Sequence, residues 1–103
     1  ILLVPSAFSP VTGAAHWEPL LRARAIETGC FVIAAAQTGT HKATSGKVRQ
    51  TYGHSLVVSP WGEVLSDAGT TRDITFVDLD LAEVSKARRR IPALTHDRDF
   101  GSP

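Results

Sequence analysis

The amino-acid sequence predicts a layered α/β or α+β fold, and two observations support this. Short apolar runs typical of buried strands alternate with segments in which apolar residues recur at helical spacing. Glycine, proline and other turn-forming residues separate these segments. The predicted order is strand, helix, strand, hairpin, strand and helix, and we expect strands outside these 103 residues to continue the sheet.

The first strand and helix form the stretch that organises the chain. Ile1–Val4 is a continuous apolar run, typical of a strand covered on both faces, and Pro5 ends it because proline cannot donate to a ladder. We expect Thr12 to cap a helix over residues 14–28, in which Pro19 is tolerable because it lies near the start. The residues at helical spacing, which should face the core, are Ala14, Trp17, Leu20, Leu21, Ala25 and Ile26.

The middle of the chain predicts a second strand and a hairpin. Cys30–Ala36 is a near-continuous apolar run and is interpreted as another buried strand. Residues 38–50 are rich in Gly, Thr, Ser and Lys, the composition of an exposed loop with a solvated His41. The runs 52–58 and 63–66 flank a proline-led turn, which predicts a β-hairpin.

The last third predicts one more strand and a second helix. Apolar and polar residues alternate over residues 74–79, as in an outer strand. Asp80 can cap a helix over residues 81–90, and the tail over residues 93–103 is polar. The helical residues expected to face inward are Leu81, Val84 and Ala87.

Composition and charge limit the classes of function. Hydrophobic residues make up 43% and charged residues 20%, as in an ordinary globular protein, and no apolar run approaches the roughly 20 residues of a membrane-spanning helix. The net charge of +1 gives no reason to expect a nucleic-acid partner, and the basic run Lys86–Arg90 is interpreted as a solvated helix end. A single cysteine, Cys30, excludes an internal disulfide, and we expect a cytoplasmic protein.

The start of the chain is unusual. The sequence contains no methionine, and residue 1 already lies inside an apolar run. We therefore expect the chain to be the C-terminal part of a longer protein, with all 103 residues in a single domain.

A binding site is predicted where the first strand ends. Ligands in α/β proteins bind beyond the carboxyl ends of strands. This rule makes Ser6, Ala7, Phe8 and Thr12 candidate residues of a pocket wall. His16 follows on the first helical turn and has two interpretations, a substrate-facing residue or a structural one.

The other reactive side chains do not form a catalytic set. Cys30 opens an apolar strand, where burial would leave a thiol inert. The four histidines show no metal-ligand spacing, so no metal site is expected. His54 and Ser55 are neighbours in a strand and point to opposite faces, which favours packing roles over a catalytic pair. From the residues alone, we infer a pocket wall without catalytic residues.

Six short motifs follow one another along the chain: Pro5–Phe8, Thr12–Glu18, Leu21–Glu27, Cys30–Gln37, Tyr52–Ser55 and Pro60–Gly62. Together these motifs resemble the nitrilase superfamily of carbon–nitrogen hydrolases. The resemblance covers nearly the whole chain. Within the superfamily, the chain is most similar to the amidase branch that includes deaminated glutathione amidase, with omega-amidase as a near relative.

This resemblance implies a fold and a reaction. The fold is an α-β-β-α sandwich that pairs across helices into a homodimer or a higher homo-oligomer. The reaction hydrolyses a small linear carboxamide to an acid and ammonia. In it, a Cys thiolate attacks the amide carbon, a Glu acts as general base and a Lys stabilises the oxyanion. The resemblance implies no metal and no organic cofactor.

The resemblance also implies that the reacting groups lie outside this chain. In the family, the Glu, Lys and Cys all precede the Pro-Ser-Ala-Phe motif, and Cys30 matches a non-catalytic cysteine. Ser6, Ala7, Phe8 and Thr12 would face the acyl part of the substrate. Two functions stay open: part of an amidase, or a catalytically inactive nitrilase-like subunit that serves as an interaction module. Nitrile and carbamoyl substrates stay open too, because their hydrolysis uses the same nucleophile.

Overall fold

The computed structural model describes residues 1–42 and 45–101, and it has the predicted α/β class. Its strands are β1 (Leu2–Leu3), β2 (Val32–Ala34), β3 (Thr38–His41), β4 (Arg49–Tyr52), β5 (Leu56–Val58) and β6 (Val64–Asp67). Its helical segments are α1 (Pro10–Thr12), the π-helical turn η1 (Gly13–Trp17), α2 (Glu18–Thr28), α3 (Ala82–Arg90) and the 3₁₀ turn η2 (Ala93–Thr95).

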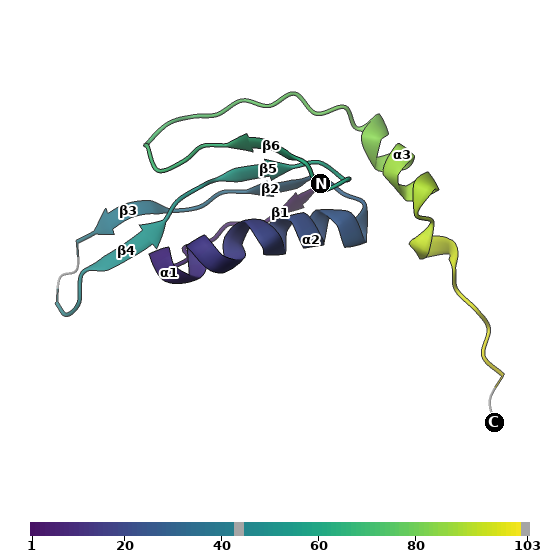
Figure 1. Cartoon of the computed structure of the whole chain (residues 1–103), viewed down its shortest axis with the longest axis horizontal. Coiled ribbons are helices and arrows are strands. Elements are labelled where there is room, and N and C mark those ends of the chain that lie inside the picture. Colours follow the sequence, from purple (N-terminus) through teal and green to yellow (C-terminus); the bar gives the residue numbers. More distant parts are fainter. Residues whose placement is uncertain (43–44, 102–103) are drawn as a thin grey trace.

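The strands form two sheets. The larger one has the order β1-β2-β5-β6, and a second one pairs β3 with β4. Helix α2 lies along one face of the larger sheet, whereas α3 lies at its end and leads into a tail that extends away from the body (Figure 1). None of the described helices has the length and apolar content needed to cross a bilayer.

The helical segment that follows β1 begins earlier than the sequence predicts. Its N-cap is Ser9, not Thr12, because the Ser9 hydroxyl accepts a hydrogen bond from the Thr12 N–H at 3.2 Å. Pro10 occupies the first helical position, where its fixed φ and missing N–H are favourable. The proline after the serine is therefore the signal that locates this helix start.

Because the helix starts at Pro10, Pro19 lies well inside it. A proline inside a helix removes one hydrogen bond and crowds the preceding turn. The wide π turn η1 ends two residues before Pro19, and we attribute this local widening to the proline. The helix ends at Gly29, as expected, with a left-handed φ of 56°.

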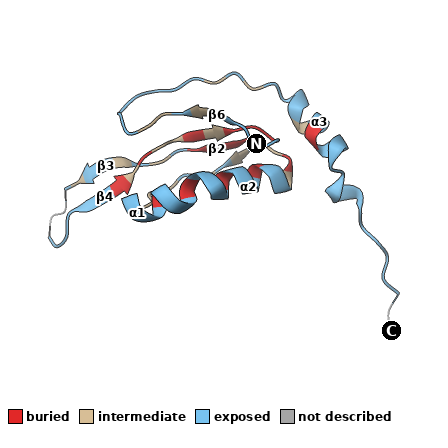
Figure 2. Cartoon of the chain, viewed as in Figure 1, coloured by how far each residue is buried: buried red, intermediate tan, exposed pale blue. Residues whose placement is uncertain are grey.

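The core lies between α2 and the larger sheet (Figure 2). Three of the six predicted helical positions are buried there. Ala14 is exposed, and Leu20 and Ile26 are 56% and 48% exposed, so that part of the prediction is wrong. The buried stripe of the helix is therefore narrower than the sequence suggests. The buried cluster consists of Trp17, Leu21, Ala25, Val32, Ala34, Leu56 and Val58.

Parallel pairing joins β1 to β2. The backbone N–H groups of Leu2, Val4 and Ser6 donate to carbonyls of the β2 segment at 2.8, 3.0 and 2.9 Å. Pairing thus continues past Pro5, in contrast to the expectation that proline ends it. Pro5 is tolerated because its nitrogen faces the other edge of β1, where no ladder bond is required of it.

The two hairpins differ in how well the sequence predicts them. β5 and β6 are antiparallel around the turn at Ser59–Gly62, as predicted. The described residues of the 38–50 segment are exposed or half-buried, in line with the prediction, but the segment is not a simple loop, because β3 lies in it and β4 begins in it, and the two strands form a second antiparallel hairpin. Two residues of that loop, Ala43 and Thr44, lie outside the described residues.

The last third also departs from the prediction. Residues 74–79 are extended but belong to no strand, and the large side chains of Ile74 and Phe76 are 76% and 89% exposed. Asp80 does accept a hydrogen bond from the Ala82 N–H at the start of α3, at 2.9 Å. Ala87 is buried as predicted, whereas Leu81 is 60% exposed.

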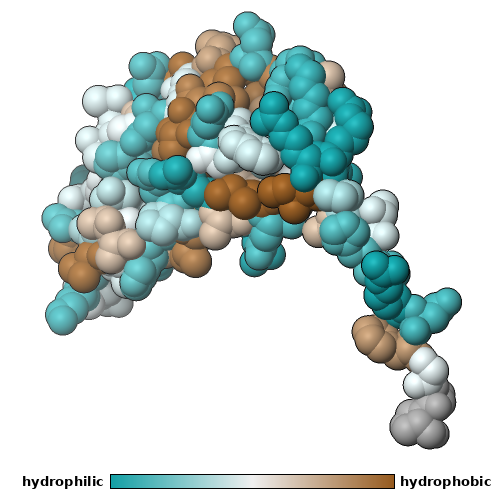
Figure 3. Space-filling view, turned by 45° about the vertical axis from the view of Figure 1, so that its right-hand side comes forward, coloured by the Kyte–Doolittle hydropathy of each residue, from teal (hydrophilic) through white to brown (hydrophobic). Residues whose placement is uncertain are grey.

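Several large apolar side chains remain on the surface. Apolar patches are visible among the polar side chains in Figure 3. Leu3 on β1 is 72% exposed, on the sheet face opposite α2. The radius of gyration is 17.4 Å, above the roughly 13 Å of a compact domain of this length, which reflects the long 71–81 segment and the tail.

At Gly13 the helical segment packs directly against β4, and this contact yields a stability prediction. A Cβ built at Gly13 would overlap the ring of Tyr52. We expect Gly13→Ala to lower the free energy of unfolding of the full-length protein that contains this chain by about 1–3 kcal/mol, measured by urea titration. The matched control is Gly101→Ala, where a Cβ meets open space. Equal stability of both variants would contradict this packing.

Candidate functional site

A cleft opens where β1 and β2 end. The Ser6 N–H donates to the Ala35 carbonyl at 2.9 Å, and the Gln37 N–H donates to the Ser6 carbonyl at 3.0 Å. The hydroxyl of Ser55 accepts from the Ala36 N–H at 3.0 Å and thereby ties β5 to this edge. The residues that line the cleft are Pro5, Ser6, Ala7, Ala35, Ala36, Gln37 and Ser55.

The lining of this cleft is uncharged. It offers hydroxyl, amide and methyl groups, and none of its residues carries a carboxylate, amine, imidazole or thiol. Such a surface can position a small polar molecule by hydrogen bonds and contact, but it supplies neither a nucleophile of lowered pKa nor a general base. The lining is therefore suited to binding and not to catalysis.

The structure brings together two of the four residues predicted to bind substrate. Ser6 and Ala7 line the cleft. Phe8 is half-buried against the core, with its ring centroid 5.1 Å from that of Trp17. Thr12 lies in the first helical turn, where its hydroxyl is 2.9 Å from that of Ser9. Substrate binding by these residues stays a prediction.

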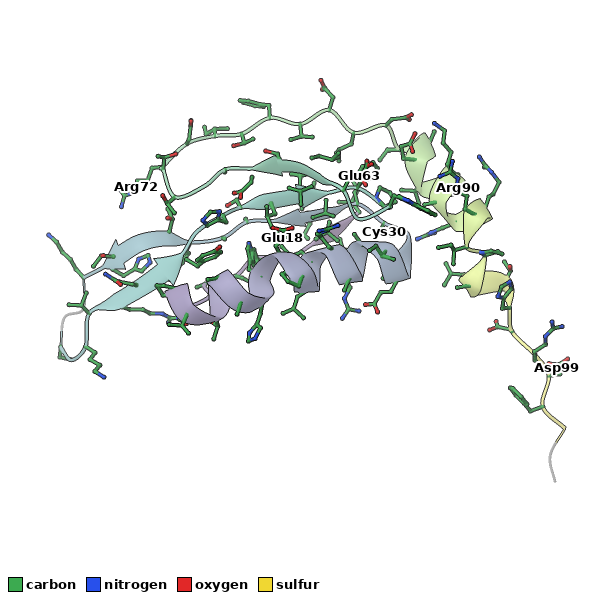
Figure 4. All side chains as sticks on the ribbon, in the orientation of Figure 1. Glu18, Cys30, Glu63, Arg72, Arg90 and Asp99 are labelled. Atoms are coloured by element: carbon green, nitrogen blue, oxygen red, sulfur yellow. The ribbon has the colours of Figure 1, made fainter. Side chains whose placement is uncertain are left out.

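Cys30 lies at the other end of β2 from the cleft. It is half-buried, less than the apolar run suggests, and its sulfur accepts a hydrogen bond from Arg88 Nη2 at 3.0 Å. Arg88 also donates to the Thr28 carbonyl at 3.3 Å. Figure 4 shows Cys30 beyond the end of α2, beside α3. The thiol thus belongs to the contact between α2 and α3, and the basic run of α3 contributes to that contact.

His54 has the packing role that the sequence favours. It occupies a left-handed conformation with a φ of 58°, and its carbonyl accepts from Trp17 Nε1 at 2.6 Å. Its ring stacks on that of Tyr52, with centroids 4.4 Å apart. Its Nδ1 lies 2.9 Å from a carboxylate oxygen of Asp67. His54 therefore links the core, β4 and β6.

The carboxylate of Asp67 responds to this environment. Partial burial raises its pKa, but the hydrogen bond from His54, the backbone N–H of Gly69 and the charge of His54 outweigh burial. The net effect lowers the pKa of Asp67 below its ordinary value of 3.8. The ionised form is thus favoured in the folded state.

Sequence reasoning missed Arg49. This residue falls in the segment interpreted as a loop, but it opens β4 and its Nη2 donates to the Ala7 carbonyl at 3.3 Å. His41 is not simply solvated, since its Nε2 lies 2.7 Å from the hydroxyl of the buried Thr51. Threonines on both sides of Ser45-Gly46 are the signal that could have indicated this hairpin.

The remaining candidates stay apart from the cleft. His16 is exposed on η1 and is not a lining residue of the cleft. Over residues 1–42 and 45–101, no group of three or more His, Cys, Asp or Glu side chains is placed to hold a metal ion.

Comparison with known proteins places the fold. Residues 1–89 match the carbon-nitrogen hydrolase family. The chain belongs to this family. It is 54% identical over 99 residues to the deaminated glutathione amidase of Dictyostelium discoideum, a match that covers 95% of this chain and 33% of that protein. It is 48% identical over 98 residues to the human deaminated glutathione amidase, covering 95% of this chain and 29% of that protein.

Solved structures agree with this assignment. The crystal structure of the Caenorhabditis elegans NitFhit protein superposes with a TM-score of 0.81 and 49% identity, covering 93% of this chain and 23% of that one. The crystal structure of Saccharomyces cerevisiae Nit3, a member of branch 10 of the nitrilase superfamily, superposes with a TM-score of 0.77 and 33% identity, covering 96% of this chain and 35% of that one. The resemblance to the nitrilase superfamily and its fold is confirmed. This carbon-nitrogen hydrolase chain spans about a third or less of the length of those curated relatives.

The pair of Asp67 and His54 yields a prediction about pH. Because the pKa of Asp67 is lowered on folding, its ionisation stabilises the fold above about pH 3.8, and this contribution is lost as the pH falls through the lower, folded-state pKa. Asp67→Asn should lower the free energy of unfolding at pH 7 by about 1 kcal/mol or less, since both side chains are partly exposed.

The measurement is the stability gap, which is the difference in free energy of unfolding between wild type and Asp67→Asn, both as the full-length protein that contains this chain, at pH 7 and at pH 3. We expect the gap to shrink at pH 3. Asp99→Asn, in the exposed tail, is the matched control and should show no gap at either pH. A gap for Asp67→Asn that is the same at both pH values would contradict the assigned role.

Proposed function

We propose that this chain is part of an amidase that hydrolyses a small linear carboxamide to an acid and ammonia. The observation that supports this proposal most is the uncharged cleft at the ends of β1 and β2, which Ser6 and Ala7 help to line. The cleft occurs in a member of the carbon-nitrogen hydrolase family. Relatives named amidases cover nearly all of this chain. In this proposal the chain supplies a wall of the substrate site.

The proposed reaction follows from the family resemblance. A Cys thiolate attacks the amide carbon and forms a tetrahedral oxyanion, which a Lys stabilises. The Glu that took the proton of the Cys thiol passes it to the nitrogen, the C–N bond breaks, ammonia leaves, and the acyl group remains on the Cys as a thioester. Water, deprotonated by a Glu, then attacks the thioester and releases the acid and the thiol. These three residues would lie outside this chain, while the loops at Ser6 and Gln37 hold the acyl part.

We further propose that residues 1–103 form the C-terminal part of a single sandwich domain. The exposed Leu3 and the half-buried Ile33 and Val57 lie on the sheet face opposite α2 and are consistent with a second layer there. On the outer side, the exposed Leu20 and Ile26 of α2 support pairing of two copies across helices, as a homodimer or a higher homo-oligomer. The lone Cys30 supports a cytoplasmic location.

A catalytically inactive nitrilase-like interaction module is the second candidate. The observation that favours it is the absence of reacting side chains from the cleft lining. A longer protein that contains this chain and carries a Cys shortly before Ile1, with a Lys and a Glu farther upstream, supports the amidase. A longer protein without those residues supports the module.

Ammonia release tests the proposal. The full-length protein that contains this chain is assayed with α-keto acid amides and with deaminated glutathione, for which relatives are named. We expect turnover of at least one of these amides, and Cys30→Ser should leave it largely intact. The 103-residue chain alone should be inactive and poorly soluble, because its strand edges lack neighbours. Ammonia release by the isolated, monodisperse chain would refute the proposal that the reacting residues lie outside it.

A further inference from the structure

Arg49 is the charged side chain that reaches the loop bordering the cleft. The β3–β4 hairpin that carries it is anchored to both loops of the cleft, because the Tyr52 N–H donates to the Phe8 carbonyl at 2.9 Å and the Gly53 N–H to the Gln37 carbonyl at 3.0 Å. From this base, Arg49 Nη2 reaches the Ala7 carbonyl at 3.3 Å. The guanidinium therefore stands beside a lining residue of the cleft.

Most of the hydrogen-bonding capacity of Arg49 remains open. A guanidinium has five N–H donors in a planar fork, and the contact with the Ala7 carbonyl uses one nitrogen. Within the part of the chain that the structure describes, Arg49 forms no ion pair with a carboxylate, in contrast to Arg22 and Arg24 on α2. Its side chain is exposed and thus accessible to a ligand.

The hairpin face that carries Arg49 is held in place. Thr51 lies two residues along β4, on the same face, and is 5% exposed. His41 is paired with Arg49 in the register, and its ring is hydrogen-bonded to the Thr51 hydroxyl at 2.7 Å. These contacts hold β4 in place, and the Arg49 side chain extends from the first residue of that strand.

The segments that build the cleft and the β3–β4 hairpin carry charge of one sign. Residues 1–17 and 28–62, which build the cleft and both strands of the hairpin, contain no Asp or Glu. The same segments contain Lys42, Lys47 and Arg49. A ligand on the Arg49 side of the cleft therefore meets positive charge, which attracts an anionic group. The carboxylates of Asp67 and Asp73 lie on the opposite side, near Ser55.

We propose that Arg49 is a specificity-determining residue of this cleft, which binds a carboxylate carried by the amide substrate at a distance from the scissile bond. This inference rests on the proposed amidase function and adds the recognition of charge to it. A single planar fork matches a carboxylate through two parallel hydrogen bonds. The Ala7 carbonyl, in turn, holds the guanidinium beside the loop that would face the acyl chain.

The test compares two substrates in the full-length protein. One is a linear carboxamide with a terminal carboxylate, and the other is its neutral methyl ester. We expect Arg49→Gln to raise the KM for the carboxylate substrate about tenfold or more and to leave kcat/KM for the ester unchanged. Arg49→Lys keeps the charge but loses the fork, so its KM for the carboxylate substrate should lie between those of wild type and Arg49→Gln.

Lys47→Gln is the matched control, since it removes a positive charge from the same hairpin without a contact to the cleft loop, and it should change neither substrate's KM. If Arg49→Gln lowers turnover of both substrates equally, or changes neither, Arg49 does not read the carboxylate and the inference is wrong. If wild type turns over neither amide, the proposed function itself fails, and the inference fails with it. Turnover of the ester by wild type shows that the protein is an amidase, so that a failure of the Arg49 inference can be told apart from a failure of the proposed function.

Discussion

The parallel pairing of β1 with β2 is the constraint on which the rest of the structure depends. Alternate N–H groups of Leu2, Val4 and Ser6 all donate to the β2 segment, so both strands end in register. Their following loops then meet at one edge and form the cleft. A slip of one residue would turn Val32 and Ala34 away from α2, so the register that buries the core also builds the cleft.

This arrangement leaves the sheet with two unequal faces. The face toward α2 holds the buried cluster, whereas the opposite face presents Leu3, Ile33 and Val57, which are exposed or half-buried. An apolar sheet face is stable when a second layer covers it. The cleft is incomplete in a similar way, because it offers contacts and hydrogen bonds but no reacting group. The complementary part of the same domain that we propose would cover the bare face and complete the site.

Apolar runs and turn residues suffice to predict β1, β2, the β5–β6 hairpin and the two main helices, because burial decides those segments. The β3–β4 hairpin escapes prediction because its composition is that of a loop, while contacts with the segment after β1, which lies far away in the sequence, hold it in place: the Tyr52 N–H donates to the Phe8 carbonyl and Arg49 to the Ala7 carbonyl. The prediction for residues 74–79 is wrong in the opposite way. Their alternating pattern is that of a strand, but a strand also needs a neighbouring strand to pair with, and the pattern within one segment does not show whether that neighbour is present. Of the site, Ser6 and Ala7 follow from the strand-end rule, whereas the reach of Arg49 to Ala7 depends on the hairpin.

The central claim is that this chain contributes the substrate wall while the reacting thiol lies elsewhere in the full-length protein. Covalent trapping tests it most directly. The full-length protein is incubated with an electrophilic analogue of its amide substrate, and the modified cysteine is located by peptide mass spectrometry. We expect an adduct on a cysteine outside residues 1–103, with Cys30 unmodified when the wild-type enzyme loses activity. An adduct on Cys30 that forms in step with the loss of activity would contradict it.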